Sequence, residues 1–199
     1  SLMAATSRPI LTIGHSRHSW ERFTTLLAGA GVETIADIRT APRSRFSPHF
    51  NKDAMRAALA ARNIEYVFLG RELGGRPQSQ SLYTGGVADY EKMAASPEFR
   101  LGLERLIEVA ARSTVALMCS EADPLECHRC LLVSRALVGR GADVRHILAS
   151  GEVVTHAEVE ERLLSLENLA EADLLARGRE ARLAQAYRSR SRKFAFAKP

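Results

Sequence analysis

The chain has 199 residues, of which 46% are hydrophobic and 26% are charged, as in an ordinary globular protein. No window approaches the ~20 apolar residues of a membrane span, and residues 4–9 lack the apolar core of a signal peptide. We therefore expect a cytoplasmic protein without a membrane partner, and the three clustered cysteines do not form a secreted disulfide framework.

Hydrophobic periodicity predicts strands that alternate with helices. Short apolar runs indicate strands at residues 10–13, 32–38, 64–69, 114–118 and 144–148. Helical spacing indicates a helix between the cap Ser19 and the stop Gly31, and others over 52–62, 87–93, 98–112 and 127–138. This pattern predicts an α/β fold, in which helices cover both faces of a mostly parallel sheet of about five strands.

Two regions depart from that pattern. Residues 70–86 are glycine-rich and too long for a plain connection, so we expect a binding loop or lid there. After residue 150 the sequence becomes helical and increasingly charged, beginning with a capping box at Thr155 and Glu158. We place an α/β domain over residues 9–156 and a helical, basic extension over residues 157–199.

The net charge of +5 owes much to the end of the sequence, where Glu180 is the only acid between residues 177 and 198. One interpretation is a solvated helix, and the alternative is an arm that binds nucleic acid. In either case we expect the fold to survive removal of the residues after Gly178. A second basic group, Arg39, Arg43 and Arg45, follows the end of the second strand.

Reactive side chains gather where the fourth predicted strand passes into a helix. All three cysteines lie between residues 119 and 130, together with Glu121, His128 and Arg129. In open α/β sheets, ligands bind beyond the carboxyl ends of the strands, and the first two strands end near polar groups of their own. We therefore predict one concavity lined by His15, Asp37, Arg39, Cys119, Glu121 and His128.

Catalytic chemistry is predicted for Cys119, Glu121 and His128. Glu121 and His128 are expected to form an acid–base pair. Cys119 is the candidate nucleophile, with a thiol pKa lowered by Arg129 and the helix start, although a small buried residue is an equal alternative. Cys127, at the helix start, is the second candidate for that role.

Several residues are predicted to bind rather than react. Arg39, Arg43, Arg76 and Arg129 suit an anionic or nucleotide-like ligand, helped by backbone N–H groups of Gly74 and Gly75. His15, Asp37 and Cys127 complete the predicted pocket, and Asp37 has the alternative role of bracing the loop over residues 40–51. Asp123 is expected to cap a helix.

A metal site is a weaker alternative, and no cofactor is indicated. Its ligands would be Cys119, Cys127, His128 and Cys130, but their spacing lacks the paired knuckles of zinc sites, and Cys130 is expected to face the core.

These motifs resemble, in order and spacing, those of the DUF488 family of uncharacterised bacterial and archaeal proteins. The resemblance spans about residues 10–156 and implies an α/β domain whose polar motif residues gather at one site, without implying a reaction. One position departs from the expected Asp-Val-Arg, since Ile38 stands between Asp37 and Arg39. The segments that carry the resemblance are Thr12–Ser16, Ala36–Arg39, Pro42–Ser44, Ile64–Tyr66, Leu73–Arg76, Tyr90 with Met93, Leu117–Glu121, Cys127–Arg129 and Val144–Ile147.

The sequence thus favours an enzyme that binds a small anionic or nucleotide-like ligand. The alternative is a nucleic-acid-associated module that grips phosphates through the arginine loop and the basic tail.

Overall fold

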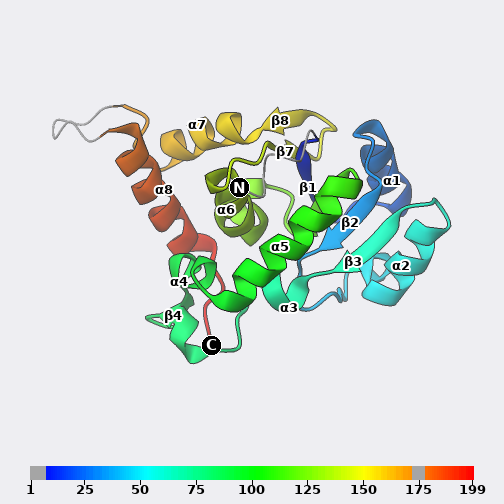
Figure 1. The fold of residues 1–199 in the computed structure, drawn as a ribbon, viewed down its shortest axis with the longest axis horizontal. Helices are drawn as coiled ribbons and strands as arrows, with labels where there is room; N and C mark the ends of the chain where they lie inside the picture. Colours follow the sequence, from blue (N-terminus) through cyan, green and yellow to red (C-terminus); the bar gives the residue numbers. More distant parts are fainter. Residues whose placement is uncertain (1–7, 172–177) are drawn as a thin grey trace.

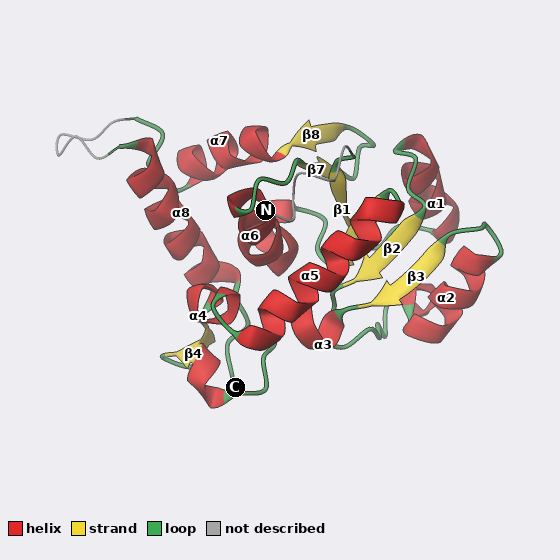
Figure 2. Cartoon of the chain, viewed as in Figure 1, coloured by secondary structure: helices red, strands yellow, loops and turns green. Residues whose placement is uncertain are grey.

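The computed structural model describes residues 8–171 and 178–199, and it confirms the α/β fold. The central sheet has six strands in the order β3-β2-β6-β1-β7-β8, of which the first five are parallel and β8 is antiparallel (Figure 2). The strands are β1 (Ile10–Gly14), β2 (Thr34–Asp37), β3 (Glu65–Phe68), β6 (Val115–Cys119), β7 (Val144–Ile147) and β8 (Val153–Thr155).

Helices cover both faces of this sheet (Figure 1). On one face α1 (Trp20–Gly29) and α2 (Lys52–Ala60) pack on strand residues such as Ile13, Ile35 and Met118. On the other, α5 (Pro97–Arg112) and the helical segment after β6 pack on Ile10, Ala36 and Leu117. Alternate residues of buried parallel strands therefore feed two cores, which explains why the strands are apolar throughout.

The helix starts follow local capping chemistry. Ser19 accepts a hydrogen bond from the backbone N–H of Arg22 at 3.1 Å, which confirms it as the cap of α1. Pro97 occupies the first turn of α5, as predicted. The predicted capping box at Thr155 and Glu158 is present and begins α7 (His156–Leu166).

Three predicted elements differ in the structure. The helix expected over 127–138 is a π-helix (Arg129–Ser134) that continues as α6 (Arg135–Gly139). The segment over 70–86 contains α3 (Gly70–Leu73), a 3-10 turn (Gln80–Leu82) and β4 (Tyr83–Thr84). The helix expected over 87–93 begins as β5 (Val87–Ala88) and becomes α4 (Tyr90–Ala94) only after Asp89.

The C-terminal extension is part of the core. Helix α8 (Arg179–Phe194) packs on α7, and its Ala186 and Tyr187 are buried in the same cluster as strand residues. The following residues pair with β5, because Ala88 N–H donates to the carbonyl of Phe196 at 2.8 Å. The expected helix is present and most of its residues are exposed or half-buried, but Ala186 and Tyr187 fix it to the core, and the predicted boundary at 156/157 falls inside α7.

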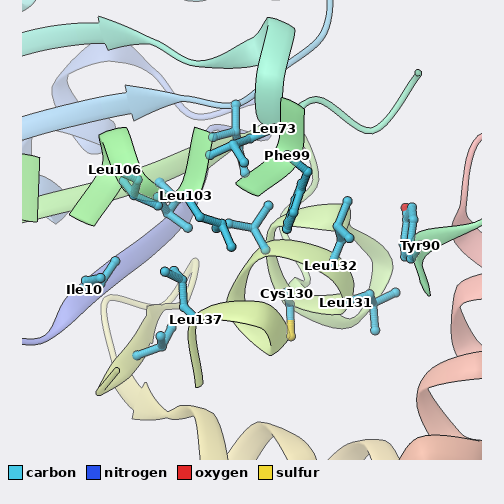
Figure 3. Packing of buried hydrophobic residues seen from close by; sticks show 14 of the residues in the cluster. Ile10, Leu73, Tyr90, Phe99, Leu103, Leu106, Cys130, Leu131, Leu132 and Leu137 are labelled. Carbon is cyan, nitrogen blue, oxygen red and sulfur yellow. The ribbon is translucent and has the colours of Figure 1, made fainter. Parts of the chain in front are cut away.

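One large hydrophobic cluster joins these parts. Figure 3 shows Leu73 of α3 and Phe99 and Leu103 of α5 facing Leu132 of the π-helix. Tyr90 lies at the edge of this cluster, near α8. None of the helices in residues 8–171 and 178–199 is long and apolar enough to cross a membrane.

Candidate functional site

The ends of β1 and β2 carry a buried layer of polar side chains, in which the charges of Asp37 and Arg39 balance each other. The Asp37 carboxylate accepts two hydrogen bonds from the Arg39 guanidinium, at 2.9 and 2.8 Å, and a third from the Tyr66 hydroxyl at 2.5 Å. Arg39 also donates to the Phe50 carbonyl at 2.7 Å and lies 3.2 Å from His15 Nε2. The predicted alternative role of Asp37 as a brace is therefore present, because Asp37 fixes Arg39 and, through it, the loop that carries Phe50.

His15 belongs to the same layer and is neutral. Its Nδ1 hydrogen-bonds the Ser16 carbonyl at 2.8 Å, which leaves Nε2 to accept from Arg39. Burial, reinforced by the positive charge of Arg39, lowers the pKa of His15 to about 4. His15 thus supports the end of β1 and carries no charge near neutral pH.

Arg129 is completely buried beneath the end of β6. Its guanidinium donates to the Cys119 sulfur at 3.0 Å and to the carbonyls of Glu121 and Ala122 at 2.6 and 3.2 Å. Its Nε donates to Thr12 Oγ1 at 3.1 Å. Buried charges are normally paired with an opposite charge, but these partners are neutral groups and a thiol. Arg129 therefore braces the β6 loop from below and does not line the cavity, although it was expected to supply positive charge there.

A chain of hydrogen bonds leads from Arg129 to Glu160 of α7. A guanidinium can only donate and a carboxylate can only accept, so the direction of every link is fixed. Burial lowers the pKa values of both histidines in the line and keeps them neutral. The line runs from Arg129 through Thr12, His146, His156 and Tyr187 to Glu160, with links of 3.1, 2.6, 3.0, 2.7 and 2.8 Å.

Two thiols and a carboxylate meet above Arg129. The sulfur atoms of Cys119 and Cys127 and a carboxylate oxygen of Glu121 lie within 4.8 Å of one another. Burial raises the pKa of the Cys119 thiol, and the neighbouring Cys127 raises it further, while Arg129 opposes the shift. The direction is opposite to the one predicted for a nucleophile at this position, so Cys119 is a protonated thiol at neutral pH.

His128 contacts Cys127 instead of Glu121. Its Nε2 donates to the Ile38 carbonyl at 2.8 Å, and its Nδ1 lies 3.7 Å from the Cys127 sulfur. Both ring nitrogens are thus engaged, so the predicted acid–base pair of Glu121 with His128 does not form in this structure. A Cβ on Gly75 would lie 3.1 Å from His128 Cγ, so glycine at that position lets the ring occupy its place.

These groups face a cavity of about 380 Å³. Seven of the ten predicted site residues line it, and the other three, His15, Asp37 and Arg129, are buried and hydrogen-bond to lining residues. Of the two backbone N–H groups predicted to bind an anion, that of Gly74 donates to the Gly70 carbonyl at 3.0 Å and is not free for this role. The predicted residues in the lining are Arg39, Arg43, Arg76, Cys119, Glu121, Cys127 and His128.

The comparisons with known proteins agree with the motifs at this cavity. A family model described as "Domain of unknown function DUF488" matches residues 19–136, more than half of the chain. The chain belongs to the DUF488 family. No curated protein and no solved structure matches the chain.

The DUF488 match ends before two aromatic residues that line the cavity, Phe194 and Phe196. Phe194 is the last residue of α8 and Phe196 follows it by two positions, whereas Tyr90 of α4, which also lines the cavity, lies inside the matched range. Burial, together with Cys127, Glu121 and Cys119, raises the pKa of Tyr90. The sequence indicated Tyr90 only as part of a family motif. It did not predict Phe194 or Phe196 as site residues, because no local pattern links residues 194–196 to β6.

The predicted metal ligands of this DUF488 protein separate into two places. Cys130 faces the core, as predicted, and burial raises its pKa to about 12. Its sulfur lies within 4.8 Å of ring nitrogens of His146 and His156, away from the cavity that Cys119 and Cys127 line. The four-ligand set that includes His128 and Cys130 is therefore wrong.

Many cations of the basic tail have partners within the protein. Arg179 pairs with Glu161, Arg188 with Glu91 and Lys193 with Glu167. Arg190 donates to the Leu125 carbonyl at 2.9 Å. Much of the positive charge of the tail is therefore engaged in contacts that hold α8 against the rest of the protein.

Proposed function

We propose that this DUF488 protein is a cytoplasmic enzyme in which Cys127, assisted by His128, attacks a small anionic substrate bound in the cavity. The observation that carries the proposal is the contact of 3.7 Å between the Cys127 sulfur and His128 Nδ1. A nucleophile beside a base that is itself oriented by a third group is the arrangement of covalent catalysis. Here the third group is the Ile38 carbonyl.

The positions of the protons on Cys127 and His128 support the assignment of Cys127 as nucleophile and His128 as base. Because His128 Nε2 donates to a carbonyl, the neutral ring has its lone pair at Nδ1, the atom that faces Cys127. The thiol proton of Cys127 passes to Nδ1, and the backbone N–H of Arg129, 3.4 Å from the sulfur, stabilises the thiolate. The sulfur then forms a bond to an electrophilic atom of the substrate, and the leaving group departs.

The charge for the substrate comes from two exposed arginines at the cavity. Arg39 is neutralised by Asp37, whereas Arg43 and Arg76 make no ion pair within the part of the chain that the structure describes. An anion held by Arg43 and Arg76 lies beside Cys127 and His128, which line the same cavity. Glu121 is exposed near both sulfur atoms, where it can exchange protons with the leaving group or with water.

Alkylation with a charged and a neutral reagent tests the proposal. Iodoacetate carries the negative charge that the cavity is proposed to bind, and iodoacetamide does not. We expect Cys127 to react before Cys119 and Cys130, and the iodoacetate-to-iodoacetamide rate ratio to exceed that of a free thiol. Arg43→Gln should lower the ratio about five-fold, the effect of roughly 1 kcal/mol of lost attraction. Peptide mass spectrometry separates the three cysteines.

The chain offers a matched control for charge. Arg45 is an exposed neighbour of Arg43 that does not line the cavity, so Arg45→Gln should leave the ratio unchanged. His128→Gln should slow both reagents alike, because it removes the base and not the anion site. First modification at Cys119, or a ratio equal to that of a free thiol, would refute the proposal.

A second candidate function, metal binding, is favoured by the grouping of Cys119, Glu121 and Cys127. Two thiolates and a carboxylate suit a soft divalent ion such as Zn²⁺. Cobalt(II) titration tests this candidate, since thiolate coordination produces strong near-ultraviolet absorption. Cys127→Ser should abolish that absorption, whereas Cys130→Ser should retain it.

A further inference from the structure

We infer that the end of α8 and the residues that follow it form an aromatic wall of the cavity, and that the ligand is an organic anion carrying a flat aromatic group. The wall consists of Phe194 and Phe196, which line the cavity together with Tyr90 of α4. This inference rests on the proposed function for the anion site, and it adds the chemical nature of the rest of the ligand. It also gives the C-terminal extension a direct part in ligand selection.

Backbone hydrogen bonds at Phe196 and two residues after it fasten the wall. Ala88 N–H donates to the Phe196 carbonyl at 2.8 Å, and Lys198 N–H donates to the Gly86 carbonyl at 2.9 Å. Ala197 forms an antiparallel bridge with Val87, and the side chain of Ala195 is buried. The position of the ring is thus set by β5 and by the core beneath it. A preformed contact surface binds a ligand with less loss of conformational entropy.

Each aromatic ring of the wall makes a cation–π contact with an arginine side chain. The Arg76 guanidinium lies 4.8 Å from the centroid of the Phe196 ring, and the Arg190 guanidinium lies 4.3 Å from that of Phe194. The Arg76 guanidinium therefore covers one face of the Phe196 ring, so a positive charge and an aromatic ring are stacked at one cavity. Phe196 is only half-buried and Phe194 is exposed, so part of each ring remains available for contact.

This composition exceeds what a simple inorganic anion needs. Phosphate or a short carboxylate is satisfied by Arg43, Arg76 and the polar groups near the thiols. An aromatic ring on the ligand gains offset stacking or edge contacts with Phe196, an interaction that changes affinity by up to roughly ten-fold beyond area burial. The cavity of about 380 Å³ has room for a ring and an acidic group.

The test compares phenyl phosphate with methyl phosphate as ligands of the full chain. Affinity is measured by calorimetry and by protection of Cys127 from iodoacetamide. We expect phenyl phosphate to bind about ten-fold more tightly, and Phe196→Leu to remove most of that difference while methyl phosphate binds as before. The matched control is Phe46→Leu, since Phe46 is 79% exposed and does not line the cavity.

The outcomes separate this inference from the proposed function. If both phosphates protect Cys127 equally in the unaltered protein, the aromatic wall is refuted while the anion site stands. If neither binds and iodoacetate shows no preference, the proposed function fails and the inference falls with it. Thermal unfolding checks that Phe196→Leu is folded. Phe194→Leu, altered at an exposed ring, gives a second reading and is expected to weaken phenyl phosphate alone.

Discussion

Burial decides what each arginine near the cavity can do. Arg39 is held by Asp37 in a bidentate pair, so its charge is neutralised. Arg129 is fully buried among carbonyls and a thiol, where it fixes the backbone of the β6 loop. Only Arg43 and Arg76 combine exposure with a place in the lining. Four arginines that look equivalent in sequence thus have different roles.

Replacing Asp37 with Asn tests the buried layer. Asn keeps the size of the side chain but leaves the Arg39 charge buried and unpaired, which typically costs about 3–5 kcal/mol of the free energy of unfolding. Urea denaturation measures the loss. The control is Asp143→Asn, because Asp143 forms an exposed pair with Arg145 and should contribute little. Equal stability of the two variants would contradict the assigned role of Asp37.

Replacing Gly75 with Ala tests the placement of His128. The added methyl group would lie 3.1 Å from His128 Cγ, so the ring must shift by a few tenths of an ångström from Cys127. Small misplacements of reacting groups are costly, and we expect Cys127 alkylation to slow several-fold with little change in stability. Gly29→Ala is the control, since nothing lies within 4 Å of its added methyl group. Unchanged alkylation in Gly75→Ala would show that the ring position is not critical.

Sequence reasoning at the residue scale identified the groups but not all of their partners. The strand pattern correctly brought Arg39, after β2, and Cys119, at the end of β6, to one sheet edge, because parallel strands end together. It assumed that Arg129 would be exposed and would activate Cys119. Burial reverses that assumption, since desolvation of the thiol outweighs the effect of one nearby charge.

At the scale of elements, the strongly periodic segments were predicted well. The five parallel strands appear close to their predicted positions, because each is a continuous apolar run. The two-residue strands β4 and β5 were missed, although Gly85 and Gly86, with φ of +58° and +79°, form the kind of turn that joins hairpins. β8 was missed because three residues at a sheet edge give too short a pattern.

The π-helix after β6 is another element that no sequence pattern predicted. Hydrophobic spacing indicates a helix but does not distinguish the wider winding over Arg129–Ser134. Such segments are rare and often occur at functional sites. Here the π-helix begins at the residue after His128 and directs Arg129 into the protein.

Truncation after Gly178 tests the role of α8. The sequence led us to expect an intact fold, but Ala186 and Tyr187 are buried, and Tyr187 links His156 to Glu160. We now expect the truncated chain to lose cooperative unfolding, as followed by circular dichroism during heating. A truncated chain that unfolds cooperatively at the original midpoint would show that α8 is an appendage after all.

At the scale of the whole molecule, buried histidines predict sensitivity to acid. The pKa of His15 is lowered to about 4, and those of His146 and His156 are also lowered, mainly by burial. Because the unfolded chain binds these protons more readily, stability is full above about pH 6.5 and falls as the pH decreases toward 4. His15 alone accounts for about 1 kcal/mol by pH 5.5.

Urea denaturation at pH 7 and pH 5.5 measures this effect. His15→Gln should reduce the difference between the two values, since its side chain does not titrate. Equal stability at both pH values in the unaltered protein would contradict the prediction.

The strand order has a consequence for how the protein folds. β6 lies between β1 and β2, so these two strands do not pair with each other. Each pairs instead with β6, which begins about eighty residues after the end of β2. Closing such long loops costs entropy before any pairing is gained, which slows folding. We therefore expect refolding in the millisecond-to-second range. The cavity lined by Cys119 and Cys127 should form only when β6 is inserted between β1 and β2.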